Sequence, residues 1–263
     1  MRTRRGRSGL CAARGERRVV RLTVLGSGDA FGAGGRLHSA YLLEAPGQTL
    51  LLDCGPSILQ ALKRLGRDPG AIDAVLVSHL HGDHFGGVPF LFMEYRYLHD
   101  RTRPFAVYGP PGTERRVRML FAALYEQNAG EPPSYPLVFE ELRPGAPATF
   151  GAVRVVPFRV PHVTELVSLG FRIEVAGRVI VYSGDSAWTE DFVQQTRGAD
   201  LFLCECSTYE TRLSIHVSYP EIAARAADLG CRRLVLTHLG DEPLRHLGEI
   251  TLECARDGMT LDL

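Results

Sequence analysis

A short segment rich in histidine and aspartate is the part of this sequence best suited to chemistry. The run Ser78–His84 reads SHLHGDH and directly follows a short apolar stretch. In an extended segment His79 and His81 point to the same side, and the intervening glycine allows Asp83 and His84 to turn toward a neighbouring point. Imidazole and carboxylate donors without thiolates suit zinc, manganese or iron. The segment therefore predicts a site for two adjacent divalent metal ions.

Further potential metal ligands lie at the ends of apolar, strand-like runs. They are His162, Asp185, His216 and His238. A lone histidine at a strand end is more often a hydrogen-bonded core residue, and His38, His99 and His246 are interpreted in that way. So many polar groups packed beside a buried strand would be costly to remove from water without a metal to bind.

These segments resemble the metallo-β-lactamase superfamily, whose hallmark is the HxHxDH motif, and within it the branch of ribonuclease Z-like phosphodiesterases. The resemblance extends from about Val19 to His238. Its motifs occur in the expected order: Gly26-Ser27-Gly28, Leu51-Leu52-Asp53-Cys54-Gly55, His79–His84, His162, Ser183-Gly184-Asp185, His216 and Thr237-His238. The resemblance implies an α/β fold, a four-layer αββα sandwich of the metallo-β-lactamase type with two mixed sheets flanked by helices.

The resemblance also implies a role for each residue. One ion would be held by His79, His81, His162 and Asp185, and the other by Asp83, His84 and His238, with Asp185 bridging both. His216 matches the catalytic histidine of the family, and Glu205 matches the acidic residue that orients it. Asp83 would also orient a metal-bridging hydroxide. From its position alone, Glu205 could equally be an exposed strand-end residue. The implied cofactors are two divalent ions, with Zn²⁺ preferred over Mn²⁺ or Fe²⁺.

The substrate predicted from these residues is a phosphodiester. A histidine that is not needed as a ligand could protonate a leaving alkoxide, which leaves poorly without a proton. Bacterial ribonuclease Z carries a long arm that grips transfer RNA between the segments matching His162 and Asp185. Here only the 22 residues at positions 163–184 separate them, so a small or cyclic phosphodiester is favoured. The alternatives are a tRNA 3′-processing endoribonuclease, a thioester or lactone hydrolase of the same fold, and a binding module without turnover.

The elements that must position these residues follow from hydrophobic periodicity. Residues 40–44 and 49–53 predict a hairpin, and helices are expected at 57–65, 88–97, 114–126 and 220–229. Strands are expected at 19–25, 74–77, 105–108, 138–142, 153–156, 167–175, 179–183, 201–204 and 233–237, followed by a short helical tail. The glycine-rich loop at 26–32 is interpreted as a close approach of the backbone beside the metals, since it lacks the lysine of a phosphate-binding loop.

Charge and composition limit the partners. The chain of 263 residues carries 30 Lys and Arg against 30 Asp and Glu, so no overall field attracts nucleic acid or membranes. Arginines crowd residues 1–18, which predicts a disordered tail with RNA binding as the alternative.

Residues 19–263 are expected to form a single metallo-β-lactamase-like domain. No apolar run is long enough to span a membrane, and the cysteines lack a CxxC spacing, so a cytoplasmic protein is expected. The resemblance also allows a homodimer.

Overall fold

Two seven-stranded sheets form the centre of the computed structural model, which describes residues 19–263. The predicted arginine-rich tail, residues 1–18, lies outside the described residues. In the first sheet the strand order is β14-β1-β2-β3-β4-β5-β6. Its strands are β1 (Arg21–Gly26), β2 (Ala40–Ala45), β3 (Gln48–Leu52), β4 (Ala74–Leu76), β5 (Phe105–Gly109), β6 (Leu137–Glu141) and β14 (Thr260–Asp262).

The second sheet mirrors the first in its mixture of strand directions. Its order is β13-β12-β11-β10-β9-β8-β7, with antiparallel pairing from β7 to β10 and parallel pairing from β10 to β13. The strands are β7 (Ala148–Phe150), β8 (Val153–Arg159), β9 (Leu169–Val175), β10 (Arg178–Tyr182), β11 (Leu201–Glu205), β12 (Leu234–Thr237) and β13 (Glu253–Cys254). Both sheets are therefore mixed, as predicted.

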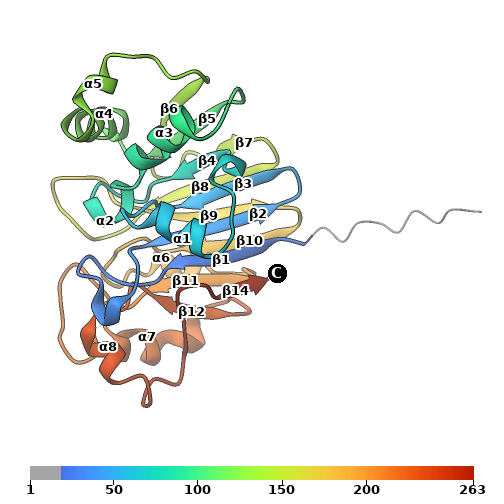
Figure 1. Cartoon of the computed structure of the whole chain (residues 1–263). Coiled ribbons are helices and arrows are strands. Elements are labelled where there is room, and N and C mark those ends of the chain that lie inside the picture. The colour runs from blue at the N-terminus through green and yellow to red at the C-terminus, as the bar shows by residue number, and fades with distance from the viewer. Residues whose placement is uncertain (1–18) are drawn as a thin grey trace, which may run out of the picture.

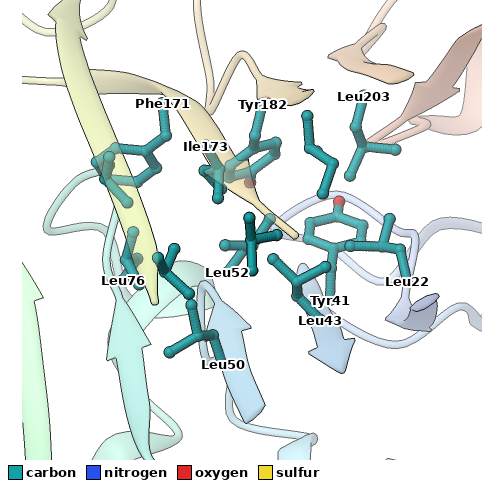
Figure 2. Close-up of a cluster of buried hydrophobic side chains, with 14 of the residues drawn as sticks. Leu22, Tyr41, Leu43, Leu50, Leu52, Leu76, Phe171, Ile173, Tyr182 and Leu203 are labelled. Atoms are coloured by element: carbon teal, nitrogen blue, oxygen red, sulfur yellow. The ribbon is translucent and has the colours of Figure 1, made fainter. Parts of the chain in front are cut away.

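The apolar side chains that alternate along the strands of both sheets meet in a common core. Figure 2 shows Tyr41 and Leu52 of the first sheet opposite Phe171 and Tyr182 of the second. Tyr41, Leu52, Phe171 and Tyr182 are each at most 1% exposed. Burying this much apolar surface on two facing sheets is the main force that holds the sandwich together.

Helices cover the outer face of each sheet. Figure 1 shows α3, α4 and α5 on one side of the sandwich and α7 and α8 on the other. The helices of the first half are α1 (Ile58–Arg64), α2 (Gly82–Phe85), α3 (Val88–Tyr97), α4 (Thr113–Leu124) and α5 (Glu126–Ala129), and those of the second half are α6 (Asp191–Gln195), α7 (Tyr219–Arg225) and α8 (Asp241–Arg245). Separate apolar clusters lie beneath each helix layer. The predicted four-layer αββα sandwich is confirmed.

The end of the chain differs from the predicted helical tail. After α8 the chain forms the two short strands β13 and β14, and β14 pairs antiparallel with β1 at the edge of the first sheet. Leu261 is buried in the core between the sheets, and Arg21 pairs with Asp262 beside it. A strand of three residues is too short for an alternating pattern to show in the sequence.

The predicted helix 114–126 is also divided, because Tyr125 leaves the helical conformation between α4 and α5.

Candidate metal centre

Strand ends place the predicted ligands at one edge of the sandwich. Strand β4 leads into the HxHxDH segment, β10 leads to Asp185, and β12 leads to His238. Strands β10, β11 and β12 run parallel, so their carboxyl ends meet at the same edge. His162 follows β8, whose end reaches that edge from the neighbouring strand pair. Residues separated by up to 159 positions in the sequence are thereby brought together.

The structure brings together all seven predicted ligands in two adjoining groups. The first group is His79, His81 and His162, and the second is Asp83, His84, Asp185 and His238. Within each group the candidate ligand atoms lie within 4.8 Å of one another. His216 joins His162 and Asp185 in a third, overlapping group. These groups could hold divalent metal ions.

Asp185 lies between the two groups. Its Oδ1 is 3.3 Å from Nε2 of His84, and its Oδ2 is 3.3 Å from Nε2 of His238. The same Oδ2 lies 3.8 Å from Nε2 of His79 and 4.0 Å from Nε2 of His162. Burial alone would raise the pKa of Asp185, but His238 and His84 outweigh it and hold this pKa well below its ordinary value. One ionised carboxylate is thus available to both groups.

Hydrogen bonds on the outer ring nitrogens orient three of the histidines. Nδ1 of His79 lies 3.1 Å from Oγ of Ser78, and Nδ1 of His162 lies 2.9 Å from the carbonyl oxygen of Ile215. Nδ1 of His238 lies 3.0 Å from Oγ of Ser39. Such partners fix the ring orientation of a ligand histidine and leave Nε2 free for a metal.

Asp53 supplies the partner of the remaining buried histidine. Its Oδ2 is 2.7 Å from Nδ1 of His84 and accepts hydrogen bonds from the hydroxyls of Ser78 and Tyr182. Its Oδ1 accepts the backbone N–H of Ser78. Asp53 is fully buried and has a left-handed backbone, with φ of 56°. A non-glycine residue is strained in this conformation, so the hydrogen bonds must hold it there. The motif Leu51-Leu52-Asp53-Cys54-Gly55 contains this residue, but the sequence alone predicted no role for it.

The donor atoms themselves provide the test of whether a metal fits. Nε2 of His79, Nε2 of His84, Oδ2 of Asp83 and Oδ1 of Asp185 are buried and have no hydrogen-bond partner. Buried polar atoms without a partner are rare and costly. These four belong to the two ligand groups, and all of them are atom types that bind divalent ions. The residues present therefore fit divalent metal ions.

His216 and Glu205 form a separate pair beside the ligands. Oε1 of Glu205 lies 2.8 Å from Nδ1 of His216, and Glu205 is 1% exposed. The carboxylate also accepts the backbone N–H groups of Ser186 and Ser207. Burial lowers the pKa of His216, but the hydrogen bond and charge of Glu205 outweigh it and raise this pKa to about 9. Glu205 is therefore not the exposed strand-end residue that its position alone allowed.

An open cavity of about 480 Å³ lies over these groups. Its floor includes His81, Asp83, His162, Asp185, His216 and His238. Phe31, Leu213 and Ile215 also line the cavity. No role was predicted from the sequence for these three apolar residues. An aromatic residue inside a glycine-rich loop was the one available signal for Phe31.

Comparison with known proteins identifies the family. The model of the Anti-Pycsar protein Apyc1 family matches residues 20–253. The chain belongs to this family. An uncharacterized protein of Mycobacterium leprae (strain TN) is 39% identical over 231 residues, which are 84% of this chain and 78% of that protein.

Solved structures with a similar fold cover almost the whole chain. The metallo-β-lactamase fold protein YhfI from Bacillus subtilis has a TM-score of 0.74 at 24% identity, covering 93% of this chain and all of that one. The short form of human tRNase Z also has a TM-score of 0.74, at 25% identity, covering 92% of this chain and 98% of that one. The metallo-β-lactamase fold and the resemblance to the ribonuclease Z branch are confirmed. Among residues 19–263, none of the helices could cross a membrane.

Proposed function

We propose that this chain hydrolyses small cyclic phosphodiesters, with cyclic nucleotides as the substrate class, using a binuclear metal centre. The observation that carries the proposal is the charge of the cavity. Apart from the proposed metal ions, its only cationic candidates are histidines of the floor, because no lysine or arginine of the described residues lines it. Asp29, Asp241 and Glu242 also line it. Such a cavity suits a single phosphodiester anion and disfavours a polyanion, whose other phosphates would face carboxylates.

The metals we propose are two zinc ions. His79, His81, His162 and Asp185 would hold one, and Asp83, His84, His238 and Asp185 the other. The support is the donor chemistry, since histidine nitrogens and carboxylate oxygens without thiolates are typical ligands of catalytic zinc. When bound, two such ions supply an activated water as nucleophile and neutralise charge on the phosphoryl oxygens.

The chain's own residues supply the proton for the leaving group. His216 faces the cavity and is held at Nδ1 by Glu205. With Nδ1–H donated to this carboxylate, Nε2 is the atom that can carry a proton to the departing ribose oxygen. Glu205 acts as a positioning residue, because its two backbone hydrogen bonds fix the carboxylate before substrate binds. Asp83, at the border of the second ligand group, would orient the attacking water.

Ribonuclease Z activity is the second candidate, because relatives of that name match much of this chain. Ribonuclease Z of Methanosarcina acetivorans is one of them. Two features oppose it. The segment between His162 and Asp185 forms only a loop and the hairpin of β9 and β10, with no protruding arm. The cavity also lacks cationic side chains for a second phosphate. A thioester or lactone substrate is disfavoured because a thiolate leaving group needs no proton donor such as His216.

A substrate panel tests the proposal. Zinc-loaded protein would be offered 3′,5′-cyclic nucleotides, a precursor tRNA and a thioester under identical conditions, and kcat/KM would be compared. We expect the cyclic nucleotides to be the best substrates and to yield a nucleoside monophosphate. Efficient cleavage of precursor tRNA with inert cyclic nucleotides would refute the proposal in favour of ribonuclease Z. The Asp185→Asn variant, offered the same panel, is the control for a contaminating hydrolase.

A further inference from the structure

The cavity over the metal centre has two apolar walls that the proposed chemistry does not use. One wall is the loop at residues 29–35, which carries Phe31, and the other is the segment 209–215, which carries Leu213 and Ile215. These side chains are 92%, 42% and 38% exposed, respectively. Exposed apolar groups gathered at the mouth of a polar site mark a place where a ligand is bound.

The loop that presents Phe31 is held in a fixed turn. Oδ1 of Asp29 accepts the backbone N–H groups of Phe31 and Ala33, at 3.1 and 3.0 Å. The backbone of Gly32 has a left-handed φ of 66°, which a residue with a side chain rarely adopts. The loop also packs against α8, where a Cβ added to Gly34 would lie 2.8 Å from a methyl group of Leu244. Phe31 is therefore exposed on a rigid support.

The segment 209–215, which forms the second wall, is tied to both the metal centre and α8. The carbonyl oxygen of Ile215 lies 2.9 Å from Nδ1 of His162, a predicted metal ligand. At the other end of the segment, Glu242 of α8 accepts the backbone N–H groups of Tyr209, Glu210 and Thr211. The two walls thus share one support, and the spacing between them is set before any ligand enters.

We infer that Phe31, together with Leu213 and Ile215 of the same cavity, binds the planar base of the cyclic nucleotide while the phosphate lies against the metal centre. The inference rests on the proposed function. A base has a polarisable apolar face that stacks on an aromatic ring, and its glycosidic bond places it at one side of the cyclic phosphate. The acidic residues that line the cavity, Asp29, Asp241 and Glu242, disfavour a second phosphate there. Because the walls contact faces of the base and not its edges, purine and pyrimidine nucleotides should both bind.

Kinetics with and without a base test the inference. Phe31→Ala, Phe31→Tyr and wild-type protein, all loaded with zinc, would be assayed on a 3′,5′-cyclic nucleotide and on the 3′,5′-cyclic phosphate of 1-deoxyribose, which has no base. We expect Phe31→Ala to raise KM for the cyclic nucleotide by about tenfold, with kcat nearly unchanged, because stacking is lost. KM for the base-free compound should not change. Phe31→Tyr keeps the ring and should behave as wild type.

Leu98→Ala is the matched control, since Leu98 is 67% exposed and lies outside the cavity. It should leave both substrates unaffected. An unchanged KM for the cyclic nucleotide in Phe31→Ala would overturn the inference and leave the proposed function intact. An equal loss on both compounds would also overturn it, because Phe31 would then act on the loop and not on the base. If wild-type protein hydrolyses neither compound, the proposed function fails, and the inference fails with it.

Discussion

The floor and the rim of the cavity are built in opposite ways. The floor belongs to the metal centre, whose seven predicted ligands include His79, His84, His162, Asp185 and His238, each at most 6% exposed. The rim consists of Phe31, the segment 209–215 and the start of α8, and its apolar side chains Phe31, Leu213 and Ile215 are 38% to 92% exposed. Strand ends and buried hydrogen bonds hold the floor, whereas surface loops tied to α8 hold the rim.

The difference indicates a division of tasks. A buried floor excludes water and strengthens every electrostatic interaction with the reacting phosphate, so it suits bond cleavage. Residues of an exposed rim can be substituted without disturbing the sheets, so they can determine which substrate binds. If this is correct, substitutions in the floor should reduce turnover or metal content, and substitutions in the rim should mainly change KM.

The largest effect is expected from Asp185→Asn. The amide cannot supply two anionic oxygens to the two ligand groups, so metal content should fall below two ions per chain. Loss of a shared ion should reduce kcat by on the order of 10⁴-fold. Elemental analysis of the purified protein and steady-state kinetics would measure both. Asp200→Asn is a suitable control, because Asp200 accepts the backbone N–H of Val179 at the start of β10, far along the strand from the site. Full metal content in Asp185→Asn would rule out a bridging role.

His216→Ala separates the proton donor from the metal ligands. We expect kcat for a cyclic nucleotide to fall by on the order of 10³-fold, because the leaving alkoxide is no longer protonated. Metal content should stay near that of wild type. On bis-p-nitrophenyl phosphate the loss should be much smaller, since p-nitrophenolate leaves without a proton. A collapse in the metal content of His216→Ala would make His216 a ligand and not an acid.

Glu205→Gln should shift the alkaline limb of the pH profile of kcat to lower pH, because it removes the carboxylate that raises the pKa of His216.

Asp53→Asn tests whether the outer hydrogen bonds of the floor matter. The variant keeps the shape of the side chain but loses the charge that holds His84, Ser78 and Tyr182. Replacing such a partner typically lowers metal affinity by about 10- to 100-fold. Competition with a chelator would measure the affinity. Asp73→Asn is the control, because Asp73 also accepts a backbone N–H, from Thr49, but lies away from the metal centre. Equal affinities in both variants would show that the ligand set alone determines binding.

The same division explains what the sequence could and could not predict. The hairpin of β2 and β3, the bounds of α3 and the grouping of the ligands follow from periodicity and from donors placed at strand ends. These are local signals combined with a strong motif. Asp53 was given no role because its partners come from strands far apart in the sequence, and only the folded sheets bring Tyr182 to it. The wall formed by Leu213 and Ile215 was missed because an irregular loop has no period, and its place depends on α8.

The smallest effect is expected from Glu242→Gln, which loosens the rim without touching the floor. Hydrogen bonds from Thr211 and from the backbone N–H groups of residues 209–211 lower the pKa of Glu242 from its ordinary 4.5 to about 2. The ionised carboxylate therefore contributes stability that is fully present above about pH 4.5 and declines as the pH falls toward 2. Chemical denaturation should show the wild type more stable than the variant at neutral pH, with the gap narrowing below pH 4.5.

Activity gives the second measurement for this variant. Because segment 209–215 would be tied less firmly to α8, KM for a cyclic nucleotide should rise about two- to fivefold while kcat changes little, since a loss of at most about 1 kcal/mol of binding free energy corresponds to at most about fivefold. Glu210→Gln makes the same charge change at a solvent-exposed residue of the same segment, so it should have neither effect. A fall in kcat as large as that of His216→Ala would show that the rim also controls the proton donor, and the separation between floor and rim would fail.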